Sequence, residues 1–413
     1  MATTRLFSAM LNEYLTPKLL TEELTKRIWF MSEVEHKMDW KGGDLIVPFE
    51  GNPATSISVG SLTASNDIAE ADFVRGKVTS QPEAWFSLIF NQRDLQEHDG
   101  KIPESTFLDV MERTVGPGMD FFREALSYQF IGGPAVLDVT DATNAATGVL
   151  VVDRIERVYK GQKLTLDDGD SPSTDVYITG INLNTSEITV SATRGGAAAN
   201  VSAYSVAQDA KLYLPGGTSG LFTSMKQALL SATNGGASTL HTKTKTDYPF
   251  LQCINVSGAA VTAANIVEKL FDFYVSVRIK SRGKASKLVM SLKHWGSVMK
   301  SQQIQKGGFK VINDPKKSEY GWWETTIAST TTGEALTVVA VPEFDDDVIV
   351  AFDPASVKIH SNGGVKKHKT PDGNEFYVVR NTSGYQYIVD TVFRGDAVWY
   401  GPTRNGVLHS ISY

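Results

Sequence analysis

The sequence predicts an α+β fold, in which helical and strand-like segments occupy separate stretches of the chain. Residues 102–130 carry apolar side chains at helical spacing and predict one long amphipathic helix. Residues 149–214 contain five short strand-like runs separated by turn residues, which is typical of a small barrel or sandwich. Residues 336–413 are mostly strand-like. A long helix between two β-rich segments therefore organises the rest of the chain.

Residues 1–40 are predicted to form an N-terminal arm. Leucines recur along it at helical spacing and lead to Trp29, so a helix here must pack on its own core or on a neighbouring subunit. Residues 41–92 are predicted to form an extended β loop, because short strand-like runs flank turn residues and a polar stretch. A lone hairpin of this length is marginally stable in water. The loop must therefore lean on another molecule or on the body of its own fold.

The long helix belongs to segment 93–148. Pro103 suits its first turn, because the missing N–H costs nothing there. The triplet Gly116-Pro117-Gly118 predicts a bend or an interruption midway, since proline removes a hydrogen bond and clashes with the preceding turn.

Residues 215–335 mix helical and strand-like patterns. An amphipathic helix is followed by a short strand and then by a second helix that Ser291 is expected to cap. This order is typical of an α/β layer. In segment 336–413, the runs 376–380 and 385–389 predict a hairpin, and the chain finishes in β structure.

Composition and charge narrow the function. The chain has 413 residues, one cysteine and a formal net charge of −6. A mildly acidic protein is not expected to coat nucleic acid by neutralising phosphates, although it can enclose nucleic acid without gripping it. One cysteine excludes a disulfide within the chain. We found no signal peptide and no apolar span of membrane length, so we expect a soluble, cytoplasmic product without a membrane partner.

No residue pattern indicates catalysis, a cofactor or a metal site. The sequence lacks a phosphate-binding glycine loop, and its seven histidines are scattered without metal-ligand spacing. The run Asp345-Asp346-Asp347 is expected to be a solvated turn, because successive residues of an extended chain point in alternate directions. Cys253 lies in an apolar stretch and is expected to be a buried hydrophobe. The sequence predicts many helices and strands but no catalytic or metal-binding pattern, which favours a structural or binding role.

Several strings carry a resemblance to a known family. One is Asn265–Leu270, followed by Lys287–Ser291 and the Trp295 helix; another is Val339–Phe344, leading to Ala351–Ser356. Together with the order of the predicted parts, they resemble the major capsid proteins of tailed bacteriophages, which have the Hong Kong 97 fold. The first string resembles the family's axial domain and the second its strand pair beside the peripheral domain. The resemblance covers nearly the whole chain.

The resemblance implies a role for each segment. Residues 41–92 would be the extended loop that lies across a neighbouring subunit, and 93–148 would be the peripheral domain with its spine helix. Residues 149–214 would be an inserted β-barrel-like domain, 215–335 the axial domain, and 336–413 a β-rich return through both. The implied function is a major capsid protein without enzyme activity. It would self-assemble into an icosahedral head shell and enclose double-stranded DNA without binding it specifically.

The resemblance also implies partners and a location. The partners would be copies of the chain itself as hexamers and pentamers, a separate scaffolding protein, a portal and a decoration protein. No cofactor is implied. The location would be the virion, after assembly in the cytoplasm of the bacterial host. The candidate inter-subunit contacts lie in the arm and the extended loop: Trp29, Trp40, Phe73, Arg75, Lys77 and Trp85.

Three alternatives remain open at this level. An encapsulin-type nanocompartment shell protein shares the fold, and the neighbouring genes would separate the two. A secreted β-rich carbohydrate-binding protein or hydrolase could be built on residues 149–214, although the sequence shows no signal peptide. A tail-tube or baseplate protein would form tubes in place of shells.

Overall fold

A computed structural model describes most of the chain in two compact units. The described residues are 27–49, 74–79, 81–91, 104–133, 135–169, 172–204, 210–217, 222–280, 285–301, 309–313, 323–329, 335–370, 373–381 and 384–411. The first unit combines Met1–Arg123 with Met225–Tyr413, and the second spans Glu124–Ser224. Both units mix sheet with helix or turn, and the α+β class predicted from the sequence is confirmed.

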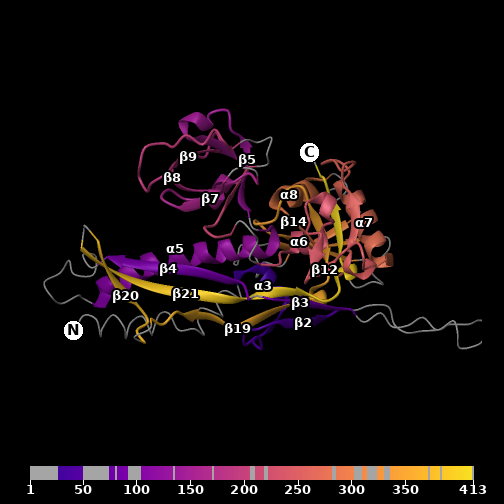
Figure 1. Cartoon of the computed structure of the whole chain (residues 1–413). Helices are drawn as coiled ribbons and strands as arrows, with labels where there is room; N and C mark the ends of the chain where they lie inside the picture. The colour runs from indigo at the N-terminus through magenta and orange to yellow at the C-terminus, as the bar shows by residue number, and fades with distance from the viewer. Residues whose placement is uncertain are drawn as a thin grey trace, which may run out of the picture. The chain divides into compact units, whose positions relative to one another are not determined.

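A long sheet forms one part of the first unit. Its five strands, counted within the described ranges, are β1 (Glu35–Lys37), β4 (Glu83–Asn91), β19 (Val357–Lys367), β20 (Tyr377–Asn381) and β21 (Gly384–Trp399). Residues 391–393 of β21 pair with β19 and with β4, so these two strands flank β21 on opposite edges. β20 forms the predicted hairpin with the start of β21. Figure 1 shows β21 as the long strand on which the others align.

The helix α5 (Glu104–Ile131) is 28 residues long, and its middle part packs on β4. The Phe86 ring of β4 stacks on Phe122 of α5 with the ring centroids 5.3 Å apart. The helix runs without a break through Pro117, so the predicted interruption is wrong. Gly118 explains why the helix persists: it has no side chain to hold α5 away from Phe86 and Leu88, and this packing outweighs the lost hydrogen bond of the proline.

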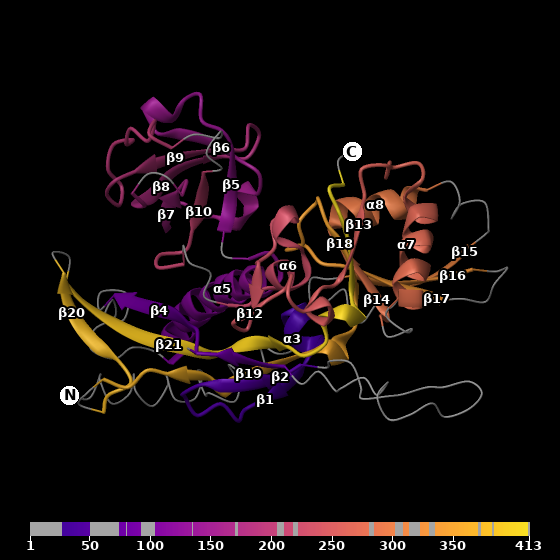
Figure 2. The same ribbon diagram turned by 45° about the vertical axis from the view of Figure 1, so that its right-hand side comes forward.

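A second sheet forms the other part of the first unit. Its seven strands in the described ranges follow the order β13 (Ile254–Ser257), β22 (Gly406–His409), β18 (Ile349–Phe352), β14 (Lys287–Met290), β17 (Ala335–Ala340), β16 (Trp323–Ser329) and β15 (Phe309–Asn313). Figure 2 shows α7 (Ile266–Lys280) and α8 (Leu292–Lys300) beside it. Leu270 and Val277 of α7 pack on Leu288 and Val338 of the sheet. The predicted helix, strand and helix order is present, but the Ser291 hydroxyl makes no capping hydrogen bond.

The second unit contains a closed barrel. Its six strands in the described ranges are β5 (Ala135–Asp141), β6 (Val149–Val152), β7 (Lys163–Asp167), β8 (Thr174–Asn182), β9 (Glu187–Ser191) and β10 (Lys211–Tyr213). Alternate residues such as Leu150, Leu164 and Ile178 fill its interior. The barrel begins at Ala135, not at residue 149, and between β6 and β7 the chain forms the 3-10 turn Ile155–Arg157.

The described parts of the arm and the extended loop belong to the first unit. The short helix α3 (Trp29–Glu33) is buried, and β2 (Leu45–Pro48) pairs with β3 (Arg75–Val78) in antiparallel fashion. Residues 1–26, the tip of the loop at 50–73 and with it Phe73 lie outside the described residues. No helix in the described ranges is long and apolar enough to cross a membrane.

Two glycines of α5 allow a matched test of its packing on β4. A Cβ at Gly118 would lie 2.8 Å from the Phe86 ring and 2.9 Å from Leu88, whereas a Cβ at Gly116 would meet nothing within 4 Å. We expect Gly118→Val to lower the free energy of unfolding by about 1–3 kcal/mol, because overpacking forces the helix off the strand. Gly116→Val should change it little. Urea denaturation of both variants measures the difference, and equal midpoints would contradict this account.

Candidate assembly site at the base of the extended loop

The structure divides the predicted contact residues into two groups. Trp29 is 1% exposed and Trp40 3% exposed, so both side chains are used inside their own subunit. Trp29 packs on Phe352 with the ring centroids 5.7 Å apart. Because neither ring has free surface, their predicted role as inter-subunit contacts is incompatible with the structure.

The remaining described candidates lie at the surface. Arg75 and Lys77 project from the exposed side of β3, and Trp85 of β4 is 47% exposed. The Lys77 ammonium pairs with the Asp44 carboxylate at 2.6 Å across the loop base. Arg75 and Lys77 thus lie at the base of the extended loop, and Trp85 lies on the long sheet.

A second, tight hairpin lies against this loop base. Its strands are β11 (Thr239–Leu240) and β12 (Lys243–Thr244), and they pair directly on either side of His241 and Thr242. Both turn residues have positive φ, 47° and 68°. Two-residue hairpin turns with this backbone normally carry Asn-Gly or Asp-Gly, because other side chains are strained there. Each such residue stores about 1–3 kcal/mol of strain.

His241 joins the loop base to the long sheet. Its ring stacks on Phe49, which directly follows β2, with an interplanar angle of 19°. Its carbonyl oxygen accepts a hydrogen bond of 2.8 Å from the Lys77 backbone N–H. On the other side, the Trp399 backbone N–H of β21 donates to His241 Nε2 at 3.0 Å. Gly76 makes this close approach possible, because a Cβ there would lie 2.5 Å from the Phe49 ring. We call Phe49 and Gly76 the seat of the turn.

The His241 imidazole is neutral in this position. Burial lowers its pKa to about 3, because no counter-charge compensates the lost solvation of the cation. Since Nε2 accepts the Trp399 N–H, the ring proton resides on Nδ1. In the sequence, His241 is only one of seven scattered histidines. No local signal marks it, because His-Thr is an unusual pair for this turn.

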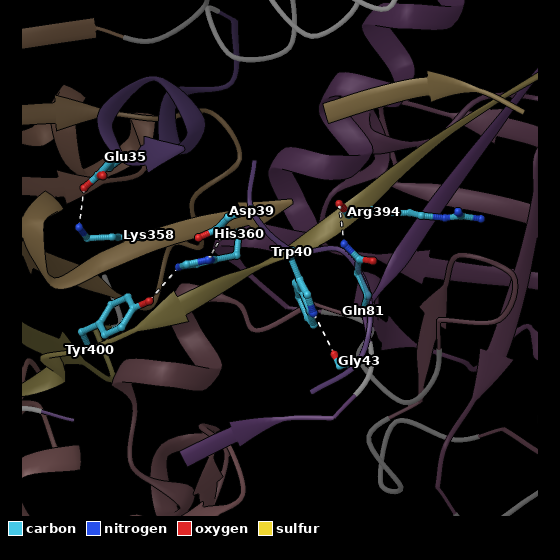
Figure 3. A network of polar contacts seen from close by, with 9 residues as sticks. All are labelled: Glu35, Asp39, Trp40, Gly43, Gln81, Lys358, His360, Arg394 and Tyr400. Atoms are coloured by element: carbon cyan, nitrogen blue, oxygen red, sulfur yellow. Dashed lines mark hydrogen bonds and ion pairs between the residues drawn. The ribbon is translucent and has the colours of Figure 1, made fainter. Parts of the chain in front are cut away.

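A polar network fixes the chain that enters the loop (Figure 3). His360 of β19 lies between Asp39 and Tyr400, with Nδ1 2.9 Å from the Asp39 carboxylate and Nε2 2.8 Å from the Tyr400 hydroxyl. This order of groups resembles a catalytic relay. However, burial raises the pKa of Tyr400 to about 12, with smaller contributions from Asp39 and Glu35, so the phenol stays protonated and is a poor nucleophile. The network therefore ties Asp39 to the sheet.

Other bonds in the same view hold both ends of the loop. The Lys358 ammonium pairs with Glu35 at 2.6 Å, and the Trp40 indole N–H donates to the Gly43 carbonyl at 2.9 Å. The Gln81 amide N–H donates to the Arg394 carbonyl at 3.4 Å. The Phe49 N–H also donates to the Val74 carbonyl at 3.1 Å, which closes the loop base. The segments before and after residues 50–73 are thus fastened at one place.

An apolar stripe lies on the face of the long sheet that points away from α5. Trp85 and Ile89 alternate along β4 with Phe86 and Leu88, which face α5. The register places Tyr377 and Val379 of β20 on the same face. All four are between 38% and 47% exposed. Ser87 and Asp390 lie between Trp85 and Ile89 on this face, so the four apolar side chains form a row with one polar interruption. A group of half-exposed apolar side chains on one sheet face marks an interaction surface. Its members are Trp85, Ile89, Tyr377 and Val379, and we call them the apolar stripe.

The other chemical candidates have structural partners. The Lys226 ammonium lies 2.8 Å from the Asp345 carboxylate and 3.8 Å from that of Asp347, so this acidic turn is ion-paired. Cys253 is a free, buried thiol, and burial raises its pKa well above the usual range. In the described part of the chain no group of three or more His, Cys, Asp or Glu side chains could hold a metal ion.

No protein-family model matches this sequence, and no curated protein matches it. Solved structures similar to it include the cyanophage A-1(L) capsid asymmetric unit, with 9% identity, a TM-score of 0.44, and coverage of 97% of this chain and 93% of that one. The capsid of an empty GTA particle has 10% identity and a TM-score of 0.44, covering 92% and 96%. A virus-like particle from Pyrococcus furiosus has 8% identity and a TM-score of 0.40, covering 95% and 96%.

Acid is expected to weaken the first unit through His241. An unfolded histidine titrates near 6.5 and the folded His241 near 3, so between these values only the unfolded chain binds the proton. The stabilisation is therefore complete above about pH 6.5 and is lost as the pH falls, by up to about 1.4 kcal/mol for each pH unit. Urea denaturation between pH 7 and pH 4 measures this slope.

The matched control for this titration is an exposed histidine. His241→Asn should reduce the pH slope, whereas His368→Asn should keep that of the wild type, because His368 is exposed. His36 and His294, whose pKa values burial also lowers, are present in every variant and cancel in the comparison. Equal slopes for the wild type and His241→Asn would contradict the assignment.

Proposed function

We propose that this chain is the major capsid protein of a tailed bacteriophage, a structural subunit without catalytic activity that self-assembles into an icosahedral head shell. The observation that carries the proposal is the anchored loop base. Phe49 and Val74, which flank residues 50–73, are joined by a hydrogen bond, and His241 ties this loop base to the long sheet. A segment that starts and ends at such a base is suited to reach a neighbouring copy from a fixed starting direction.

The arrangement around the loop base supports the same function. The long sheet with α5 corresponds to the proposed peripheral domain and its spine helix. The seven-stranded sheet with α7 and α8, counted in the described ranges, corresponds to the proposed axial domain. The barrel of the second unit corresponds to the inserted domain. Their order along the chain is the order that the Hong Kong 97 resemblance implies.

The apolar stripe supports self-association. Four half-exposed apolar side chains on one sheet face would lose contact with water when a partner covers them, and this transfer is the main driving force of association. The partner that the proposal assigns is a second copy of the chain, within hexamers and pentamers of the shell. Arg75 and Lys77 at the loop base and Trp85 in the stripe remain the proposed contact residues.

The charge of the chain supports an enclosing role toward DNA. With a net charge of −6, the shell wall would not compete for phosphates, and packaged double-stranded DNA would be held without specific binding. The proposal extends to a separate scaffolding protein, a portal and a decoration protein as partners. It also places assembly in the cytoplasm of the bacterial host and the product in the virion.

Electron microscopy of the expressed chain tests the proposal. Closed shells are the expected product, and Ile89→Asp should abolish them without lowering the subunit's melting temperature, because it charges the apolar stripe. Leu183→Asp is the matched control: Leu183 is exposed on the barrel and lies outside the stripe, so shells should form normally.

The other outcomes count against the proposal in distinct ways. A wild-type chain that stays monomeric under all conditions would refute self-assembly. Tubes would support the tail-tube alternative. Shells that co-purify with an enzyme and no DNA from the native host would support the nanocompartment alternative. Normal shells from Ile89→Asp would remove the apolar stripe from the interface.

A further inference from the structure

The β11–β12 turn has a backbone that its own sequence does not favour. Among the described residues, His241 and Thr242 are the one adjacent pair of non-glycine residues with positive φ; Ser186 and Ser410 occur singly. Threonine is a particularly poor residue for this region, because its branched Cβ crowds the backbone. A strained turn of this kind persists only when its surroundings hold it in place.

The groups that hold the turn come from two other elements. Phe49, Gly76 and Lys77 belong to the loop base, and the Trp399 amide belongs to the long sheet. Within the turn, the Thr242 hydroxyl donates to the His241 carbonyl at 2.6 Å, so this oxygen accepts two hydrogen bonds. The turn therefore bridges the loop base and β21, and its strain opposes the contacts that it makes.

We propose that the His241–Thr242 turn is a releasable clamp that sets the direction in which the extended loop leaves the subunit. While His241 lies between Phe49 and the Trp399 amide, the β2–β3 pair is fixed on the sheet. When His241 withdraws, the turn relaxes, and the relief of strain offsets part of the lost bonding. The loop base can then change its angle to the sheet. The clamp itself is a property of the subunit, and its role in shell assembly rests on the proposed function.

The clamp is releasable because the backbone strain of the turn opposes the contacts that hold His241 in place. A turn of Asn-Gly would hold the same backbone without strain, and opening it would release nothing. Gly76 makes the closed position possible, because a side chain there would meet the Phe49 ring and the His241 carbonyl, which lies 2.8 Å from the position of a Cβ. The seat and the turn are thus shaped for each other, so a side chain added at Gly76 or the loss of the His241 ring should open the clamp.

Two variants of the full-length chain change the clamp in opposite directions. His241→Asn keeps a residue that tolerates positive φ, but its side chain is too short to stack on Phe49 and bond the Trp399 amide. It should open the clamp. Thr242→Gly removes strain together with the hydroxyl bond inside the turn, and it leaves the contacts of His241 with Phe49, Lys77 and Trp399 in place, so it should tighten the clamp.

Hydrogen exchange and limited proteolysis of unassembled subunits provide the readout. In His241→Asn we expect the Trp399 amide to exchange about five- to tenfold faster, and cleavage within residues 50–73 to accelerate by a similar factor, as the loss of one net hydrogen bond implies. In Thr242→Gly both rates should fall below those of the wild type. Unchanged rates in His241→Asn, or faster rates in Thr242→Gly, would overturn the clamp.

A third variant distinguishes opening of the clamp from misfolding of the subunit. Gly76→Ala leaves the turn untouched and fills its seat, so it should reproduce the fast exchange of His241→Asn while the barrel's near-ultraviolet circular dichroism and melting remain those of the wild type. Slow exchange at Trp399 in Gly76→Ala would show that the seat does not control the turn and would count against the proposal.

Shell images separate this inference from the proposed function. If the wild type forms uniform shells, His241→Asn should form shells of mixed diameter, because the loop direction is no longer fixed. Uniform shells from a variant with fast Trp399 exchange would refute the clamp's role in assembly. If the wild type forms no shells at all, the proposed function fails, whereas the exchange result still decides whether the clamp exists.

Discussion

Pairing along both edges of β21 is the constraint on which the first unit depends. This strand of 16 residues bonds to β4 on one edge and to β19 and β20 on the other. Its last residue, Trp399, buries its ring among Phe30 and Phe352, with centroids 6.3 Å away in both pairs. The same residue offers its amide to His241. The arm, the long sheet and the loop base therefore converge at one position.

Periodicity explains which parts of this fold can be predicted. The α5 helix and the β20–β21 hairpin are encoded in local apolar spacing, and they appear close to their predicted limits. The break expected at Pro117 does not occur, because packing of Gly118 on β4 is a tertiary effect that no local rule contains. The first barrel strand was missed for a related reason: β5 follows the helix after a very short turn, so it was assigned to the helical segment.

The site was less predictable than the fold. Trp29 and Trp85 both stand in amphipathic segments, yet one is buried and the other is half exposed, because exposure depends on which distant strand covers each ring. His241 gave no signal, since its role depends on a strained turn and on the meeting of Phe49 with Trp399, residues that lie far apart in the chain. Residue type predicted where aromatic contacts occur, whereas only the topology determined which of them stay inside the subunit.

Closure of the barrel in the second unit has a consequence for the proposed shell, in which many copies would lie close together. A closed ring of β5 to β10 satisfies its backbone groups internally and leaves no strand edge. Open edges are the usual starting points of unwanted sheet-to-sheet aggregation, a danger that grows with local concentration. A unit built as a closed ring would therefore stand beside its copies in such a shell without recruiting them through its backbone.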